Sequence, residues 1–167
     1  MTAQNEFLIV DVPVAERARL EGILEESFEG WYLRHSKKTL MDAELVRAAV
    51  SSGTPVGLIM LKTLAADVGY VYYIATAEAC RRKGVGKMLL EDALRYFASA
   101  GMKDVFASVE AGNAPSEGLF RSEGFVKTSF GEVSRKRGSL RTLDMYRRMV
   151  VVPGEVLLLK DLARENA

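Results

Sequence analysis

Residues 81–87 read Arg-Arg-Lys-Gly-Val-Gly-Lys and so place four cationic side chains and two glycines within seven positions. The segment falls where an extended apolar run gives way to an amphipathic stretch, between a predicted strand and a predicted helix. Glycine lets the backbone approach a ligand closely, and the first turn of a helix has N–H groups without a partner in that helix. Because a helix N-terminus also carries a partial positive charge, the segment predicts a phosphate site.

Two common nucleotide-binding patterns do not fit this segment. The P-loop requires a Gly five positions before its Gly-Lys pair and a Ser or Thr after it. Here those positions hold Arg81 and Met88. A dinucleotide fingerprint that began at Gly84 would need a third glycine at position 89, which is Leu89. Specific residues therefore exclude both patterns.

The pattern Arg81-x-x-Gly84-x-Gly86 resembles the pyrophosphate-binding loop of the GNAT (Gcn5-related N-acetyltransferase) superfamily, Gln/Arg-x-x-Gly-x-Gly/Ala. The preceding residues 73–76, Tyr-Ile-Ala-Thr, resemble the strand before that loop. Downstream, Asn113-x-x-Ser116-x-x-Leu119-Phe120-x-x-x-Gly124-Phe125 is similar to the second signature of the family, Asn-x-x-Ala/Ser-x-x-Leu-Tyr-x-x-x-Gly-Phe. The resemblance covers residues 68–128 and is looser outside them.

The resemblance implies an α/β (α+β mixed) fold with a central mixed, mostly antiparallel sheet, two splayed parallel strands and helices on both faces. It also implies that strand backbone binds the pantetheine arm and thioester of acetyl-CoA by strand addition, while the loop holds the pyrophosphate. Asn113 would satisfy backbone groups where the strands splay, and Phe120 would pack along the pantetheine. The implied coenzyme-binding residues are Ile74, Ala75, Thr76, Arg81, Arg82, Lys83, Gly84, Val85, Gly86, Lys87, Asn113, Ser116 and Phe120.

Acetyl transfer to an amine needs a deprotonated nucleophile and stabilisation of the oxyanion, often with an acid for the leaving thiolate. Relatives commonly carry a Tyr acid where this chain has Phe120, so another group supplies the proton or the thiolate leaves with electrostatic help alone. The candidate catalytic residues are Glu110, Tyr70 and Tyr72. If Glu110 has no catalytic role, it is a solvated carboxylate at the end of a strand. If the two tyrosines have none, they pack in the sheet. A weaker alternative is Tyr146 beside Asp144, and a water-relayed base would leave no residue signature.

Alternation along the strand at 68–76 places Tyr70 and Tyr72 on one face and Tyr73 on the other. Trp31 and Tyr32 either line an acceptor pocket, as that region does in similar proteins, or pack in the core. The basic segment 135–141 is either a solvated hairpin or a site that attracts an acidic acceptor or nucleic acid.

The numbers of each residue type favour a protein without metal chemistry. His35 is the only histidine and Cys80 the only cysteine, so a zinc site lacks its usual ligands, and His35 is expected on a loop or a helix surface. The 23 basic side chains nearly balance the 22 acidic ones, so no overall field recruits nucleic acid or a membrane. No signal peptide or membrane-spanning run is visible, which favours a cytoplasmic location.

Residues 1–167 are predicted to form one domain, with core motifs at 68–128 and a tail at 150–167 that packs on the body or on a second subunit, as in a homodimer. The expected strands are 7–12, 45–50, 55–64, 68–76, 103–110, 125–130 and 143–151. The expected helices are 14–28, a short segment at 31–41, the stretch from 85 to 100, 114–123 and the tail at 155–164.

These features predict an N-acetyltransferase that moves an acetyl group from acetyl-CoA to a primary amine by direct attack in a ternary complex. The amine would belong to a protein N-terminus, a lysine or a small molecule. A non-catalytic acyl-CoA-binding sensor is the first alternative, because of Phe120 and the lack of an obvious base. A nucleic-acid or anion-binding module that uses the two basic clusters is the second.

Overall fold

The structure is a computed structural model that describes residues 7–164 of the 167-residue chain. The described elements, in chain order, are β1 (Leu8–Asp11), the 3-10 helix η1 (Val14–Leu20), α1 (Glu21–Ser27), α2 (Gly30–Asp42), β2 (Leu45–Ser51), β3 (Thr54–Ala65), β4 (Val68–Thr76), the 3-10 helix η2 (Glu78–Cys80), α3 (Val85–Ser99), β5 (Asp104–Glu110), α4 (Ala114–Ser122), β6 (Val126–Lys127), α5 (Phe130–Arg137), α6 (Ser139–Arg148) and β7 (Glu155–Asp161).

The described strands form one mixed sheet in the order β1-β2-β3-β4-β5-β7-β6. β2 pairs antiparallel with β1 and β3, and β7 pairs antiparallel with β5 and β6. β4 and β5 are parallel, and their register covers Val68–Val71 and Asp104–Ala107 although both strands continue beyond it. This mostly antiparallel sheet with one parallel pair confirms the predicted fold class.

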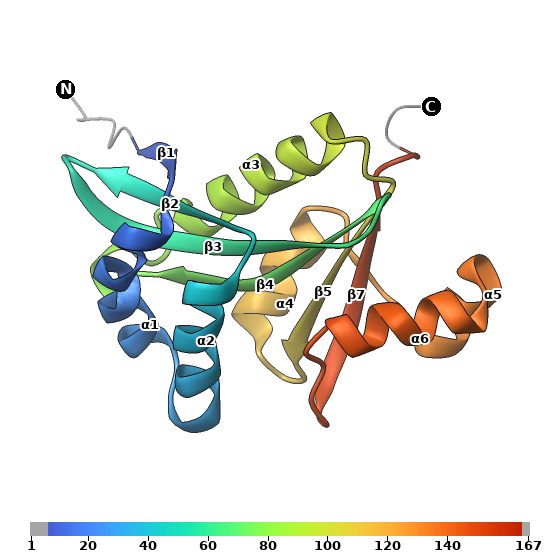
Figure 1. Ribbon diagram of the computed structural model, residues 1–167. Coiled ribbons are helices and arrows are strands. Elements are labelled where there is room, and N and C mark those ends of the chain that lie inside the picture. The colour runs from blue at the N-terminus through green and yellow to red at the C-terminus, as the bar shows by residue number, and fades with distance from the viewer. Residues whose placement is uncertain (1–6, 165–167) are drawn as a thin grey trace. The chain divides into compact units, whose positions relative to one another are not determined.

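The chain divides into two compact units. The first comprises residues up to 61 together with 73–93, and the second comprises 62–72 with the residues from 94 onward. In the first unit, α3 lies on one face of the sheet and α1 and α2 lie on the other (Figure 1). The single domain that the sequence predicts stays a prediction.

Close packing in the first unit fixes where α3 begins. A Cβ atom on Gly57 of β3 would lie 2.7 Å from Val85 Cγ1 and 3.2 Å from the carbonyl oxygen of Ala75. Only glycine therefore fits at this point without a shift of its neighbours. Elsewhere in the unit, the buried guanidinium of Arg17 donates hydrogen bonds to the carbonyls of Leu40 (3.1 Å) and Ala43 (2.8 Å), which ties η1 to the end of α2.

The core of the second unit contains side chains from four strands, β3, β4, β5 and β7, and from the α5–α6 region. Its buried members are Leu64, Val68, Tyr70, Phe106, Val133, Met145, Met149 and Leu157. The helices α5 and α6 (orange in Figure 1) supply Val133 and Met145, and Met149 directly follows α6. These helices therefore belong to the packed body of the unit.

The second half of the chain contains the wrong secondary-structure predictions. Residues 143–151, predicted as a strand, lie mostly in α6, whose buried Thr142, Met145 and the following Met149 recur with a helical period. The strand predicted at 125–130 is reduced to Val126–Lys127. The helix predicted at 155–164 is instead β7, because pairing with β5 decides the conformation of this apolar run. The described part of the tail thus packs on its own chain, and residues 165–167 lie outside the described part.

Other predictions needed smaller changes or none. The helix predicted at 14–28 is divided into η1 and α1 at Leu20, and the segment at 31–41 is a full helix that starts at Gly30. The strands at 45–50, 55–64, 68–76 and 103–110 and the helices that start at 85 and 114 are confirmed within one or two residues. Within residues 7–164, no helix is long and apolar enough to cross a membrane.

Gly69→Ala is expected to lower the free energy of unfolding by about 1–3 kcal/mol, the usual cost of overpacking. The added Cβ would lie 2.5 Å from Phe97 Cε1, and Gly69 is itself buried in β4. Gly118→Ala is the matched control, since nothing lies within 4 Å of its Cβ and the exposed helix position gains up to about 1 kcal/mol from alanine. Urea unfolding measures both variants, and equal stabilities would contradict the close contact at Gly69.

Candidate functional site

The basic glycine segment forms the turn between η2 and α3. Arg82 and Gly84 have positive φ angles of 61° and 81°, so both residues adopt the left-handed backbone conformation just before the helix. The first helical hydrogen bond of α3 runs from the Met88 N–H to the Gly84 carbonyl at 3.0 Å. The N–H groups of Val85 and Gly86 therefore precede the hydrogen-bonded ladder of the helix and can face an anion.

Arg81 holds this turn in place. Its Nη2 donates to the Glu26 carbonyl oxygen at 2.5 Å, and its Nε approaches the Thr76 carbonyl at 3.4 Å. The Glu26 carboxylate accepts the Glu78 N–H at 2.6 Å. The end of α1 is thus fastened to the segment between β4 and α3. The structure gives Arg81 a positioning contact, and Arg82 and Lys83 are exposed.

The end of β4 leads directly into the turn. Ala75 is buried, Ile74 and Thr76 are half-buried, and the Ala77 N–H donates to the Val56 carbonyl at 2.8 Å. Ile74 and Thr76 lie outside the parallel register with β5, which ends at Val71. This is the backbone condition that strand addition by a ligand requires.

The residues of the second signature form the start and body of α4. Asn113 is the N-cap, and its Oδ1 accepts the Ser116 N–H at 3.3 Å. Phe120 is buried, with its ring edge-on to Phe125 at a centroid distance of 5.0 Å. A phenylalanine here offers no hydroxyl to protonate a thiolate. The coenzyme contacts of Asn113, Ser116 and Phe120 stay predictions.

Tyr70 and Tyr72 pack against each other in the second unit, edge-on at 4.9 Å, on the shared face that alternation predicts. The Tyr70 hydroxyl lies 3.1 Å from Ser108 Oγ and donates to the Val150 carbonyl at 3.4 Å. Burial raises the pKa of Tyr70 well above its usual range, since it disfavours the charged phenolate. Tyr70 is therefore a poor base, and its geometry favours the packing interpretation.

Glu110 is the exposed carboxylate among the predicted catalytic residues. It ends β5, where it stands opposite Glu155 of β7, and its carbonyl accepts the Asn113 N–H at 3.1 Å. Like charges in register on neighbouring strands repel each other. The Glu155 carboxylate accepts the Val152 N–H at 3.0 Å, which fixes its position. The proton-accepting role of Glu110 stays a prediction.

A ring cluster in the first unit joins His35 and Tyr73, to which sequence reasoning gave no function, with Trp31, which it placed in an acceptor pocket or in the core. His35 Nδ1 lies 2.7 Å from the Tyr73 hydroxyl, and the imidazole stacks on Trp31 at 4.8 Å with an interplanar angle of 10°. Phe28 contacts the Tyr73 ring edge-on at 5.3 Å. The i, i+4 spacing of Trp31 and His35 was a visible signal. The contact with Tyr73 was not, because the two residues are 38 positions apart.

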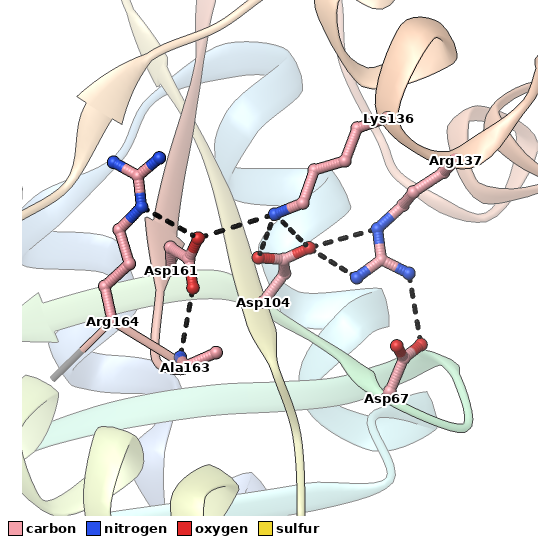
Figure 2. Close-up of polar contacts among 7 residues, drawn as sticks. All are labelled: Asp67, Asp104, Lys136, Arg137, Asp161, Ala163 and Arg164. Carbon is pink, nitrogen blue, oxygen red and sulfur yellow. Dashed lines mark hydrogen bonds and ion pairs between the residues drawn. The ribbon is translucent and has the colours of Figure 1, made fainter. Parts of the chain in front are cut away.

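The basic segment 135–141 is not a hairpin, as the structure places its first residues in the last turn of α5. Figure 2 shows that Lys136 and Arg137 both bind the buried Asp104, and that Arg137 also reaches Asp67 at 3.1 Å. Lys136 lies 3.5 Å from Asp161 as well. Two of the cations that could attract an acidic ligand are therefore neutralised by carboxylates of the same unit.

The chain is similar to acetyltransferases in sequence. The profile of the acetyltransferase (GNAT) family matches residues 12–125. A protein of Bacillus subtilis (strain 168) named "Putative phosphinothricin acetyltransferase YwnH" is 39% identical over 70 residues. That match spans 40% of this chain and 43% of the length of YwnH.

Solved structures share the fold. The ribosomal-protein-S18-alanine N-acetyltransferase of Escherichia coli superimposes with a TM-score of 0.71 at 15% identity, over 94% of each chain. A PaiA N-acetyltransferase of Thermoplasma acidophilum, solved in complex with coenzyme A, has a TM-score of 0.71 at 16% identity, over 93% of this chain and 99% of that one. A third structure is described as that of "a putative phosphinothricin N-acetyltransferase". It has a TM-score of 0.67 at 19% identity, over 94% of this chain and 99% of that one.

Proposed function

Because the chain belongs to the acetyltransferase (GNAT) family and is therefore an acyltransferase, we propose that it moves the acetyl group of acetyl-CoA to the primary amine of a small molecule. The reaction would proceed by direct attack of the amine in a ternary complex. Residues 1–167 would act as one acetyltransferase domain.

The observation that carries the donor assignment is the turn at the start of α3. Exposed Arg82 and Lys83 flank backbone N–H groups at a helix N-terminus, and Arg81 and Glu26 hold that backbone in position. Directed N–H groups combined with cationic side chains suit the pyrophosphate of a coenzyme A thioester. The strand end at Ile74 and Thr76 is continuous with this turn, so the pantetheine arm would extend along it.

Atoms and charge balance in the proposed reaction. The amine lone pair attacks the thioester carbonyl carbon, and a C–N bond forms. The tetrahedral intermediate then collapses as the C–S bond breaks and the sulfur keeps the electron pair. The proton that the nitrogen loses passes to the thiolate, which leaves as coenzyme A. Because a thiol has a pKa near 8.5, the thiolate is a good leaving group, and the missing hydroxyl at Phe120 does not prevent the step.

A small-molecule acceptor is supported by YwnH, which is 39% identical over 70 residues and is named "Putative phosphinothricin acetyltransferase". The similarity to the ribosomal-protein-S18-alanine N-acetyltransferase is at 15% identity, so it supports a shared fold and not a shared acceptor. Phosphinothricin is accordingly the first acceptor to test, and a primary polyamine and a peptide with a free N-terminal alanine are suitable comparisons.

The test is release of free thiol from acetyl-CoA in the presence of each amine, with the acetylated product identified by mass spectrometry. We expect phosphinothricin or the polyamine to be acetylated, with one coenzyme A released per acetyl group transferred. Turnover of the peptide alone would contradict the small-molecule acceptor. Acetyl-CoA binding without turnover of any amine would instead favour the acyl-CoA sensor and contradict the transferase proposal.

A further inference from the structure

We propose that Tyr73 and His35 form the proton-accepting pair of this enzyme, with Tyr73 in contact with the acceptor amine and His35 as the base behind it. This inference rests on the proposed transferase function, and it assigns to two residues a role that Glu110, Tyr70 and Tyr72 were expected to fill. Tyr73 would be the catalytic residue and His35 the residue that positions its hydroxyl and takes its proton.

The contact between the two side chains is short and directional. Tyr73 Oη lies 2.7 Å from His35 Nδ1, the usual length of an O–H hydrogen bond. A neutral imidazole that carries its proton on Nε2 has Nδ1 as an acceptor, so the tyrosine hydroxyl donates to it. Thr39 Oγ1 approaches the same nitrogen at 3.4 Å. Nδ1 is thus surrounded by hydroxyl groups that fix the orientation of the ring.

Aromatic packing holds both rings while leaving them within reach of solvent. The imidazole is stacked on Trp31 within α2, and Phe28 lies edge-on to Tyr73. Tyr73 and His35 are half-buried, and Trp31 is 43% exposed. A rigid pair at a partly open surface can meet a substrate, whereas the hydroxyl of the buried Tyr70 is directed to Ser108 and a carbonyl.

The pair also lies beside the expected donor backbone, within the same unit. Tyr73 directly precedes Ile74, whose backbone is the expected partner of the thioester, and consecutive Cα atoms are about 3.8 Å apart. The turn that would hold the pyrophosphate follows the same strand after Thr76. A proton acceptor at position 73 is therefore placed next to the expected reacting carbonyl.

The proton transfers balance. The acceptor arrives as an ammonium ion and gives one proton to Tyr73 Oη as the tyrosine proton moves to His35 Nδ1, which leaves a neutral amine and an imidazolium. After the attack and the loss of coenzyme A, the second proton of the nitrogen goes to the thiolate, and the imidazolium releases its proton to water.

The test compares kcat for phosphinothricin, or for whichever amine the wild-type enzyme acetylates, among Tyr73→Phe, His35→Ala and the double variant. Each single change should lower kcat by about 10²-fold or more, with unchanged affinity for acetyl-CoA by calorimetry. The double variant should be no slower than the slower single variant, because the two residues act as a unit. Tyr96→Phe in α3 is the matched control and should keep wild-type kcat.

Rescue by added imidazole separates a proton-transfer role from a packing role. Imidazole should restore turnover by His35→Ala in a saturable way, and it should leave Tyr73→Phe slow. Wild-type kcat in either single variant, the absence of rescue, or a comparable loss confined to Glu110→Gln would overturn the pair. Wild-type enzyme that acetylates no amine overturns the transferase proposal, and the pair with it, whereas active wild type with active variants overturns the pair alone.

Discussion

Gly86→Asp is expected to abolish acetyl-CoA binding. The substitution places a carboxylate in the first turn of α3, among the N–H groups that we assign to the pyrophosphate. Two unit charges 4 Å apart repel by about 4 kcal/mol at an effective dielectric constant of 20, which corresponds to roughly a 10³-fold loss of affinity. An acidic residue in a first helical turn favours the helix, so the fold of α3 should survive the change.

Gly86→Asn is the matched control, since asparagine has nearly the shape of aspartate without its charge. It should weaken binding far less than Gly86→Asp does. Calorimetric titration with acetyl-CoA measures both affinities, and circular dichroism confirms that both variants are folded. Equal affinities for the two variants, or wild-type affinity for Gly86→Asp, would remove residues 81–87 from the coenzyme site.

Asp104→Asn is expected to lower the free energy of unfolding by about 3 kcal/mol. Asp104 is 1% exposed and accepts hydrogen bonds from Lys136 at 3.1 Å and from Arg137 Nε at 3.0 Å. Breaking a buried ion pair costs about 3–5 kcal/mol because the remaining charge stays desolvated, and the partial exposure of Lys136 places this case at the lower end. The loss should loosen the attachment of α5 to the start of β5.

Asp144→Asn provides the same chemical change at an exposed pair. The Asp144 carboxylate lies 3.3 Å from Arg148 Nε on the surface of α6, where an ion pair contributes at most about 0.5 kcal/mol. Denaturant unfolding of both variants compares the two sites. A destabilisation of Asp104→Asn no larger than that of Asp144→Asn would show that the buried network does not hold α5 in place.

The same network should make stability depend on pH in acid. Burial alone would raise the pKa of Asp67, but the hydrogen bond and charge of Arg137 outweigh burial and hold the pKa below its usual value. A carboxyl whose folded pKa lies below its unfolded value of about 3.9 stabilises the protein above that pH, and this stabilisation is lost as the pH falls through the folded pKa. As the pH is lowered from 4, the free energy of unfolding of Arg137→Met should therefore fall less than that of the wild type.

The sequence predicted the part of the fold that local signals define. The glycines at 84 and 86, the cap at Asn113 and the alternating residues of 68–76 placed β4, α3 and α4 within one or two residues. Such signals act over a few residues of chain, so they can be read without the tertiary structure. The turn at the start of α3 belongs to this class.

The rest depended on contacts between distant parts of the chain. The apolar run at 155–161 becomes a strand because it pairs along β5, about fifty residues earlier in the sequence. Arg137 lies 70 positions from Asp67, and His35 lies 38 positions from Tyr73. No local pattern in the sequence predicts these long-range contacts. The turn at the start of α3 was therefore predictable, whereas the contact between His35 and Tyr73 and the basic network of α5 were not.

Whether the turn at the start of α3 binds the donor is tested most directly by nuclear magnetic resonance of isotope-labelled protein titrated with acetyl-CoA. We predict that the backbone N–H signals of residues 82–87 shift most, together with those of Ile74 and Thr76, and that desulfo-CoA shifts the signals of 82–87 in the same way. Unchanged signals at 82–87 at saturating acetyl-CoA, or the largest shifts at residues 135–141, would contradict the assignment of the donor site.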